Sequence, residues 1–199
     1  MNFFCKVWYW FWFCVLYIPL SIFYPVKIIN KSNGKFKGHK IFICNHLHNL
    51  DPVMLCIRMG VRVRFVAKKE LFENRFVGGL FKSLGAIPID RYNTDIAAMK
   101  KIMGVLKQNE QMVICPEGTR NKKSEDAQEV KKGAILFALK TKSPLVPCCY
   151  TRRLKFMRRT SLVIGEPFDF SEYYGQPITK ELLDKLSVKL SDSIWGLKY

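Results

Sequence analysis

Acidic residues are absent from the first quarter of the chain. No aspartate or glutamate occurs before Asp51, whereas six lysines do. Over all 199 residues, 33 lysines and arginines stand against 16 acidic residues, which gives a net charge of +17. An excess of this size favours an anionic partner, such as a nucleic acid, an acidic membrane surface or a phosphorylated substrate.

Histidine is scarce, and the cysteines are not arranged in pairs with metal-ligand spacing. The chain has three histidines and an odd number of cysteines, seven, with no C-x-x-C pair. This pattern argues against a disulfide framework and against a zinc site, and it indicates a reducing, cytosolic environment. Internal repeats and low-complexity segments are also missing, and the length fits one domain with an appendage.

Charge is missing from residues 7–24, while eleven of the first 25 residues are aromatic. Eighteen apolar residues are at the short end for a spanning helix, and Pro19 is expected to bend or end it. The favoured interpretation is a membrane anchor that either spans or lies in one leaflet. A cleaved signal peptide is disfavoured, because no small-residue cleavage site follows the apolar run. A buried core helix remains an alternative interpretation. If the segment spans, the five lysines from Lys27 to Lys40 place the rest of the chain on the cytoplasmic face.

The remainder of the chain alternates short β-rich runs with helical patterns. The pattern predicts strands at 26–29, 41–44, 61–67, 86–89, 111–115, 145–150 and 161–164, helices at 52–59, 94–108, 131–140 and 180–195, and a further helix somewhere within 71–84, which contains Gly78-Gly79. This alternation predicts an α/β fold, with a mixed, largely parallel central sheet flanked by helices and an N-terminal aromatic-rich membrane-anchoring helix. We therefore expect an anchoring segment over 1–25 and one domain over 26–199, with functional residues at the ends of strands.

The first such strand end carries His46 and Asp51. Five residues apart on one helix, they would lie roughly 140° apart around the axis and would not meet, but a strand-to-helix turn can join them. We expect Asp51 to cap the helix that starts at Pro52 and also to orient the imidazole, which makes His46 a better proton acceptor. The alternative is that Asp51 is only a helix cap and His46 only a loop histidine.

Two further clusters follow predicted strands. Gly85 to Arg91 closes on an Asp-Arg pair, and the Arg91 guanidinium suits a phosphate, although it could instead pair with its neighbour on the surface. The loop Pro116-Glu117-Gly118-Thr119-Arg120 could bind an anion through its N–H groups and Arg120, with Glu117 holding Arg120 or a substrate hydroxyl. The alternative is an ordinary turn with a surface ion pair.

Basic residues gather again late in the chain. Between Glu129 and Glu166 there are nine basic residues and no acidic one, five of them between Arg152 and Arg159. A run of this kind is often only a solvated face. Beside an aromatic anchor, it favours contact with anionic lipid.

Taken together, Asn45-His46-x4-Asp51, the Gly85 to Arg91 segment, Pro116 to Arg120 and Val146-Pro147 resemble the 1-acylglycerol-3-phosphate acyltransferase family over about residues 26–170. The resemblance implies transfer of a fatty acyl group from a thioester to the 2-hydroxyl of lysophosphatidic acid, which gives phosphatidic acid. It implies His46 as general base, Asp51 as its orienting partner, and a glycerol-phosphate site formed by Lys68, Arg91, Glu117, Gly118, Thr119 and Arg120. The chain departs from the family pattern at His48, where a small hydroxyl residue is frequent, at Pro88, which replaces an aromatic residue, and at Cys115, which replaces a phenylalanine.

The expected partners are a membrane phospholipid surface, lysophosphatidic acid, and either acyl-CoA or acyl-carrier protein as co-substrate. No metal and no further cofactor is expected, and backbone N–H groups near the His46 to Asp51 turn are expected to stabilise the oxyanion. Cys44 and Cys115 are alternative nucleophiles, although their strand positions favour packing. Other open interpretations are an acyltransferase for glycerol 3-phosphate or another lysophospholipid, and a non-catalytic membrane-surface module. A nucleic-acid-binding protein would explain the charge, but no reading helix or stacking motif supports it.

Overall fold

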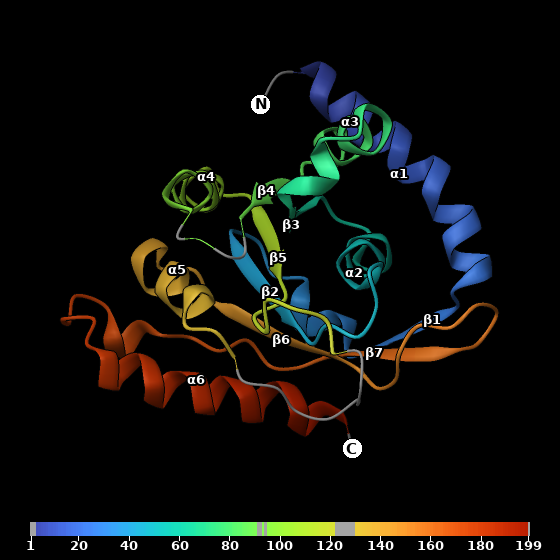
Figure 1. Cartoon of the computed structure of the whole chain (residues 1–199). Coiled ribbons are helices and arrows are strands. Elements are labelled where there is room, and N and C mark those ends of the chain that lie inside the picture. The colour runs from blue at the N-terminus through green and yellow to red at the C-terminus, as the bar shows by residue number, and fades with distance from the viewer. Residues whose placement is uncertain (1–2, 91–92, 94, 122–129, 199) are drawn as a thin grey trace.

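The computed structural model describes residues 3–90, 93, 95–121 and 130–198, and a seven-stranded sheet forms its centre (Figure 1). The strands are β1 (Val26–Ile29), β2 (Lys40–Cys44), β3 (Val63–Lys68), β4 (Ile87–Ile89), β5 (Gln111–Ile114), β6 (Leu145–Tyr150) and β7 (Thr160–Ile164). Their order in the sheet is β1-β7-β6-β2-β5-β3-β4. Of the strand pairs in the described part of the chain, only β6 and β7 run antiparallel. The prediction of a mixed, largely parallel sheet is confirmed.

Helices cover both faces of this sheet (Figure 1). One face is covered by α1 (Phe3–Phe23), α2 (Asp51–Met59) and α3 (Arg75–Ser83), and the other by α4 (Ile96–Lys107), α5 (Gly133–Thr141) and α6 (Lys180–Trp195). The central strand β2 is buried throughout because successive side chains alternate between the two layers. Phe42 and Cys44 pack toward α2, whereas Ile41 and Ile43 pack toward α4, α5 and α6.

The helix expected within 71–84 is present as α3 and begins at Arg75. The structure has a short 3-10 helix, Lys69–Phe72, and α3 starts only after Asn74, whose side chain accepts hydrogen bonds from the N–H groups of Phe76 and Val77. Gly78 allows the two pieces to pack closely, because a Cβ there would lie 2.6 Å from the backbone oxygen of Phe72. The other 3-10 helices are Lys31–Gly34, Ser171–Tyr173 and Gly196–Lys198.

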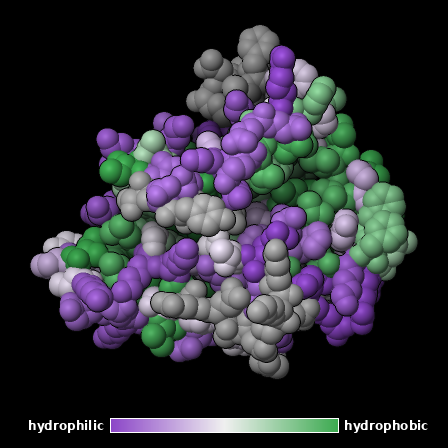
Figure 2. Space-filling model, in the orientation of Figure 1, coloured by the Kyte–Doolittle hydropathy of each residue, from purple (hydrophilic) through white to green (hydrophobic). Residues whose placement is uncertain are grey.

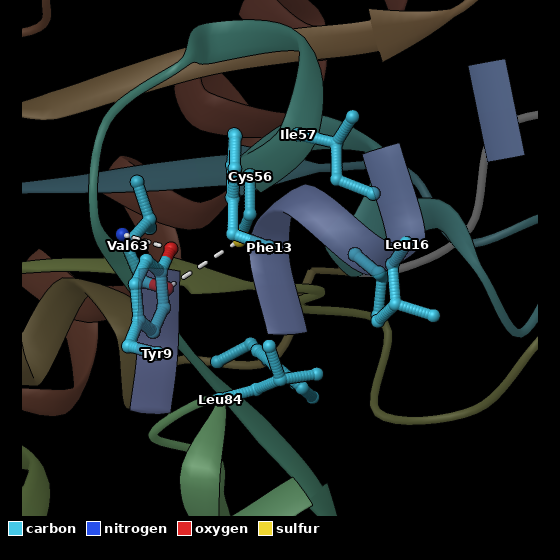
Figure 3. A pocket seen from close by; sticks show the side chains of 9 residues that line it. Tyr9, Phe13, Leu16, Cys56, Ile57, Val63 and Leu84 are labelled. Carbon is cyan, nitrogen blue, oxygen red and sulfur yellow. Dashed lines mark hydrogen bonds between the residues drawn. The ribbon is translucent and has the colours of Figure 1, made fainter. Parts of the chain in front are cut away.

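The N-terminal helix α1 runs past Pro19 to Phe23, so of the two expected effects of Pro19, a bend or an end, the end of the helix is excluded. One side of α1 packs on the core through Tyr9, Trp12, Leu16 and Leu20. Figure 3 shows the Tyr9 ring against α2 and β3, where its hydroxyl oxygen accepts a hydrogen bond of 3.3 Å from the N–H of Val63. The helix is therefore fixed to the same core as the sheet.

The outward side of α1 is also apolar. A stripe with alternating three- and four-residue spacing is exposed, and it consists of Trp8, Phe11, Val15, Ile18 and Ile22. Figure 2 shows apolar residues gathered on the side of the molecule where Figure 1 places α1 and α2. No helix within residues 3–90, 95–121 and 130–198 is both long enough and apolar enough to cross a membrane.

Lys40, the last of the five lysines that follow the N-terminal helix, is not a surface residue. Its side chain is 1 % exposed, and its ammonium group donates hydrogen bonds to the backbone oxygens of Gly34 and Phe36 and lies over the Phe36 ring. Burial lowers the pKa of Lys40. This cation therefore stabilises the start of β2 and adds little to the basic surface.

Candidate active site

The turn after β2 is fixed by the ends of both neighbouring strands. The Asn45 side chain bonds the backbone of Tyr150 twice, through its amide nitrogen to the Tyr150 oxygen at 3.0 Å and through its amide oxygen from the Tyr150 N–H at 2.8 Å. On the β5 side, the N–H of His46 donates to Glu117 Oε1 at 3.4 Å, and its oxygen accepts from the N–H of Asn121 at 2.9 Å. The backbone of His46 is thus held between β6 and the loop after β5.

The Asp51 carboxylate is fully buried and folds back onto this turn. Its Oδ2 accepts hydrogen bonds from the N–H groups of Leu47 at 2.7 Å and His48 at 2.6 Å, and it lies 3.3 Å from His46 Nδ1. The Tyr150 hydroxyl donates to the Asp51 backbone oxygen at 2.7 Å. The expected contact between the carboxylate and the imidazole is present.

The expectation that Asp51 caps the following helix is wrong. Asp51 is the first residue of α2, Leu50 precedes it in a helical conformation, and no side chain caps the helix N–H groups. The carboxylate instead occupies the N–H groups of Leu47 and His48, while Glu117 occupies that of His46. These three amides are therefore not free to stabilise an oxyanion, and the expectation of oxyanion donors near this turn is left to its other N–H groups.

Two thiols lie beside His46. Ile43 and Ile114 are paired in register, so the next residues, Cys44 and Cys115, lie side by side with their sulfurs 3.4 Å apart. The hydrogen bond from Cys44 lowers the pKa of Cys115 to about 6, against the effect of burial and with help from the charge of His46. The same hydrogen bond and burial raise the pKa of Cys44.

Burial by itself lowers the pKa of His46, but the negative charge of Cys115 and the hydrogen bond to Asp51 outweigh it and raise the pKa to about 10. Both shifts favour an imidazolium beside a thiolate. This arrangement holds the same number of protons as a neutral imidazole beside a neutral thiol, so one proton transfer from nitrogen to sulfur gives His46 a free lone pair.

Glu117 is buried, and burial raises its pKa to about 7. Its Oε1 accepts the N–H of His46, and its Oε2 is buried without a hydrogen-bond partner. From the sequence, Glu117 was expected to hold either Arg120 or a substrate hydroxyl. Within the described part of the chain it forms no salt bridge with Arg120. Glu117 instead joins the loop after β5 to the loop that carries His46.

A cavity of about 410 Å³ opens beside His46. Its wall contains His46, Cys115, Gly118 and Lys131, together with the apolar residues Val66, Ile89, Met99, Ile102, Ile114, Ala134 and Phe137. Asp90, Asn93 and Asp95 add polar groups to the wall. A largely apolar cavity with a few polar groups is typical of a site for an apolar ligand that carries one reactive group.

Lys131 is a site residue that the sequence analysis missed. Gly118 has φ +72°, a conformation that favours glycine, and a Cβ at this position would lie 2.7 Å from the Lys131 ammonium nitrogen. The N–H of Lys131 donates to the Pro116 oxygen at 2.9 Å, which fixes the residue beside the loop. Nothing in the sequence separates Lys131 from its basic neighbours, because its position follows from the packing of two loops.

The other predicted site residues are distributed unevenly. Thr119 and Arg120 are exposed. The burial of His48 and the charges of Arg120 and Arg153 lower the pKa of His48. Lys68 pairs with Glu70 at 3.0 Å and is not part of the cavity wall. Arg91 lies outside the described residues.

His48, the unexplained second imidazole, has a place in the turn. Its Nδ1 accepts the N–H of Leu50 at 3.3 Å, and its ring lies 5.6 Å from the ring of Tyr24. Because burial lowers its pKa, His48 is neutral at pH 7 and can keep accepting this bond. It stabilises the turn and joins it to the end of α1.

The chain was compared with known proteins. The model of the Acyltransferase family matches residues 25–151. A 1-acyl-sn-glycerol-3-phosphate acyltransferase of Bacillus subtilis is 32% identical over 194 residues, which cover 94% of this chain and 96% of the relative. One of Streptococcus pneumoniae is 33% identical over 139 residues, which cover 66% of this chain and 51% of the relative. The crystal structure of a 1-acyl-sn-glycerophosphate (LPA) acyltransferase of Thermotoga maritima has the same fold, with a TM-score of 0.71 at 21% identity over 98% of this chain and 78% of that one.

Proposed function

Because the chain belongs to the 1-acylglycerol-3-phosphate acyltransferase family, we propose that it transfers a fatty acyl group from an acyl thioester to the 2-hydroxyl of 1-acylglycerol 3-phosphate, with His46 as the general base and Asp51 as its orienting partner. The product is phosphatidic acid. The observation that carries the residue roles is the position of Asp51 Oδ2, which accepts two backbone N–H groups and lies 3.3 Å from His46 Nδ1. The carboxylate is thereby fixed before the substrate arrives, and it holds one tautomer of the imidazole.

The proposed step moves one proton and exchanges one bond. The 2-hydroxyl gives its proton to the free nitrogen of His46 while its oxygen attacks the thioester carbonyl carbon. The tetrahedral intermediate then expels the thiolate of the donor, which takes the proton from the imidazolium. A positioned base contributes about 10² to 10⁴-fold to such a reaction. The reaction needs no cofactor beyond acyl-CoA or acyl-carrier protein.

Cys115 can accept the proton that must leave His46 before the reaction. In the free enzyme the imidazolium–thiolate pair is favoured, since each charge stabilises the other. A partly apolar substrate beside Cys115 disfavours both charges of the pair, because desolvation raises the pKa of a thiol and lowers that of an imidazole. Substrate binding thus returns the proton to sulfur and frees the base.

The cavity beside His46 accounts for the two ends of the substrates. Its apolar wall, which includes Met99, Ile102 and Phe137, suits a fatty acyl chain. Lys131 lines the same cavity, and Arg120 lies near enough to act on His48, so both supply positive charge for the glycerol phosphate. We assign Arg91, Thr119 and Gly118 to the same phosphate site, and Lys68 a supporting role at its edge.

The substrate and product both reside in membranes, and α1 presents an apolar stripe to them. Because the inward side of α1 is part of the core, deletion of residues 1–25 would also disturb folding. Replacement of exposed Ile18 by Glu is a sharper test: binding to vesicles should weaken while the melting temperature stays within a few degrees. We place the domain on the cytoplasmic face of the membrane, in agreement with its lysines and unpaired cysteines.

A direct assay tests the function and its alternatives. Purified protein is given labelled acyl-CoA or acyl-carrier protein, with lysophosphatidic acid, glycerol 3-phosphate and other lysophospholipids as acceptors. We expect phosphatidic acid from lysophosphatidic acid, and loss of about 10² to 10⁴-fold in kcat in the His46→Ala variant. Preference for another acceptor would support the related acyltransferases instead. Vesicle binding without any turnover would support a non-catalytic membrane module.

A further inference from the structure

A second cavity, of about 400 Å³, lies where α1 meets β1 and the end of α2. We call it the Arg58 cavity, and it is lined by Ser21, Pro25, Val26, Lys27, Arg58 and Arg159. Arg58 is near the C-terminal end of α2, whereas Asp51 is at its start. Seven residues of helix separate the two by about 10 Å along the axis. The Arg58 cavity is therefore distinct from the cavity beside His46.

The Arg58 cavity is strongly cationic. Half of its lining residues are basic and none is acidic. Among the described residues, Lys27, Arg58 and Arg159 form no salt bridge. The charges of Lys35 and Arg58 add to the effect of burial in lowering the pKa of Lys31, so like charges crowd this part of the molecule. An anion placed here would relieve that repulsion.

Two residues that line the cavity each carry a buried polar atom without a hydrogen-bond partner, Arg58 Nε and Ser21 Oγ. Buried polar groups are nearly always paired, because the loss of water must be compensated. A guanidinium N–H and a hydroxyl are both good donors to a phosphate oxygen. The unpaired donors and the excess of positive charge point to the same kind of ligand.

Exposed apolar residues lie in the loop that leads to Arg159 and contact the end of α1. Phe156 is 65% and Met157 61% exposed, and the ring of Phe156 stacks on that of Phe23 at 5.2 Å. The N–H of Met157 donates to the Phe23 oxygen at 2.7 Å, which joins this loop to the end of α1. The same loop holds a smaller hollow of about 230 Å³ lined by basic residues only: Arg152, Arg153, Lys155, Arg158 and Arg159. Apolar tips beside clustered cations match the interface of an anionic bilayer.

We propose that the Arg58 cavity binds the phosphate of an anionic phospholipid in the bilayer, while Phe23, Phe156 and Met157 insert beside it. This inference rests on the proposed function only in placing the enzyme at a bilayer. The bound lipid is neither the substrate being acylated nor part of the catalytic turn. Since phosphatidic acid is itself anionic, membranes rich in the product would retain the enzyme.

The test measures binding of the full chain to two kinds of vesicle. One is phosphatidylcholine alone, and the other contains roughly one quarter phosphatidylglycerol. The variant is Arg58→Gln with Arg159→Gln, and the matched control is Lys180→Gln with Lys185→Gln, two exposed cations of α6. From the usual contribution of each cation near an anionic surface, the variant should bind the anionic vesicles about 30-fold more weakly. The control should change by less than about threefold, and binding to neutral vesicles should not differ between the two.

Three outcomes would overturn the proposal. Equal losses in variant and control would show that net charge alone drives binding. Tight binding of inorganic phosphate that needs Arg58, without any change in vesicle binding, would assign the cavity to free phosphate. An unchanged affinity of the Arg58→Gln, Arg159→Gln protein for anionic vesicles would also reject it. A thermal melt checks folding. If the double variant unfolds, the single variant Arg159→Gln at an exposed position replaces it, and its affinity for anionic vesicles should fall about fivefold.

Turnover separates this proposal from the proposed function. On lysophosphatidic acid dispersed in neutral detergent, the Arg58→Gln, Arg159→Gln variant should match the unchanged protein. On anionic vesicles its rate should fall with binding. If no acyl transfer occurred on any acceptor, the proposed function would fail, whereas the vesicle-binding result would still decide the fate of the Arg58 cavity.

Discussion

Replacement of Asp51 by asparagine should separate the charge of this residue from its geometry. In the structure Oδ2 makes all three polar contacts, while Oδ1 is buried without a partner. An asparagine with its oxygen in the place of Oδ2 keeps the bonds from Leu47 and His48 and still faces His46 Nδ1. The reverse orientation would point amide hydrogens at two N–H groups. The substitution thus removes one negative charge and little else.

The size of the effect follows from that lost charge. Two unit charges about 4 Å apart attract by about 4 kcal/mol at an effective dielectric constant of about 20. A hydrogen bond to a charged group exceeds a neutral one by about 1 to 2 kcal/mol. At about 1.4 kcal/mol per factor of ten, kcat of the Asp51→Asn variant should fall by roughly 10- to 10³-fold. The pKa of His46 should fall as well, because Asp51 is one of the groups that raise it.

The assay follows release of the free thiol from the donor, with kcat and KM measured separately. Asp51→Ala is the contrasting variant, since it leaves the N–H groups of Leu47 and His48 without acceptors. Its free energy of unfolding should fall by about 2 to 6 kcal/mol in urea denaturation, whereas that of Asp51→Asn should fall much less. Wild-type kcat in Asp51→Asn would refute the role of the charge, and equal destabilisation by both changes would refute the geometric argument.

Three other predictions concern the loop after β5. Glu117→Gln should remove a pH dependence of stability: the folded pKa of about 7 exceeds the ordinary value of 4.5, so the unchanged protein loses about 2 to 4 kcal/mol of unfolding free energy as pH rises from 4.5 to 7. Denaturation that is equally pH-dependent in both proteins would contradict this. Gly118→Ala should displace Lys131 and raise KM for the acceptor severalfold, whereas Gly104→Ala, in open space on α4, should stabilise the protein by about 0.5 to 1 kcal/mol. Alkylation of Cys115 by iodoacetamide, followed by peptide mass spectrometry, should rise around pH 6 rather than pH 9; a midpoint near 9 would rule out the thiolate.

The order and type of most elements could be predicted from the sequence, because buried strands and amphipathic helices leave periodic patterns. The helix over 180–195 agrees with α6 in both bounds, and the strand over 145–150 agrees with β6. The helix expected within 71–84 occupies only Arg75–Ser83, and the 3-10 helix before it packs closely on Gly78, a contact that leaves no periodic signal. Local pattern reports periodicity, whereas close approach of two backbones depends on the whole fold.

The chemistry at the site divides in the same way. The spacing of His46 and Asp51 was enough to expect their contact, because a strand-to-helix turn brings such residues together. The actual partners of the carboxylate, the amides of Leu47 and His48, contradict the expected helix cap. A carboxylate at a helix start can accept hydrogen bonds either from the N–H groups of the helix or from those of the preceding turn. Only the surrounding structure decides between these two sets of donors.

The sequence by itself determined the α/β class, the apolar character of the N-terminal helix and the contact between His46 and Asp51, because these depend on residue type and local spacing. Only the tertiary structure decided that the thiol of Cys115 lies beside His46, that Lys131 reaches the loop at Gly118, and that Arg58 and Ser21 carry buried donors without partners near the end of α1. Each of these depends on side chains from separate elements meeting in space. Burial and neighbouring charge then set their chemistry, and neither is recorded in the order of residues.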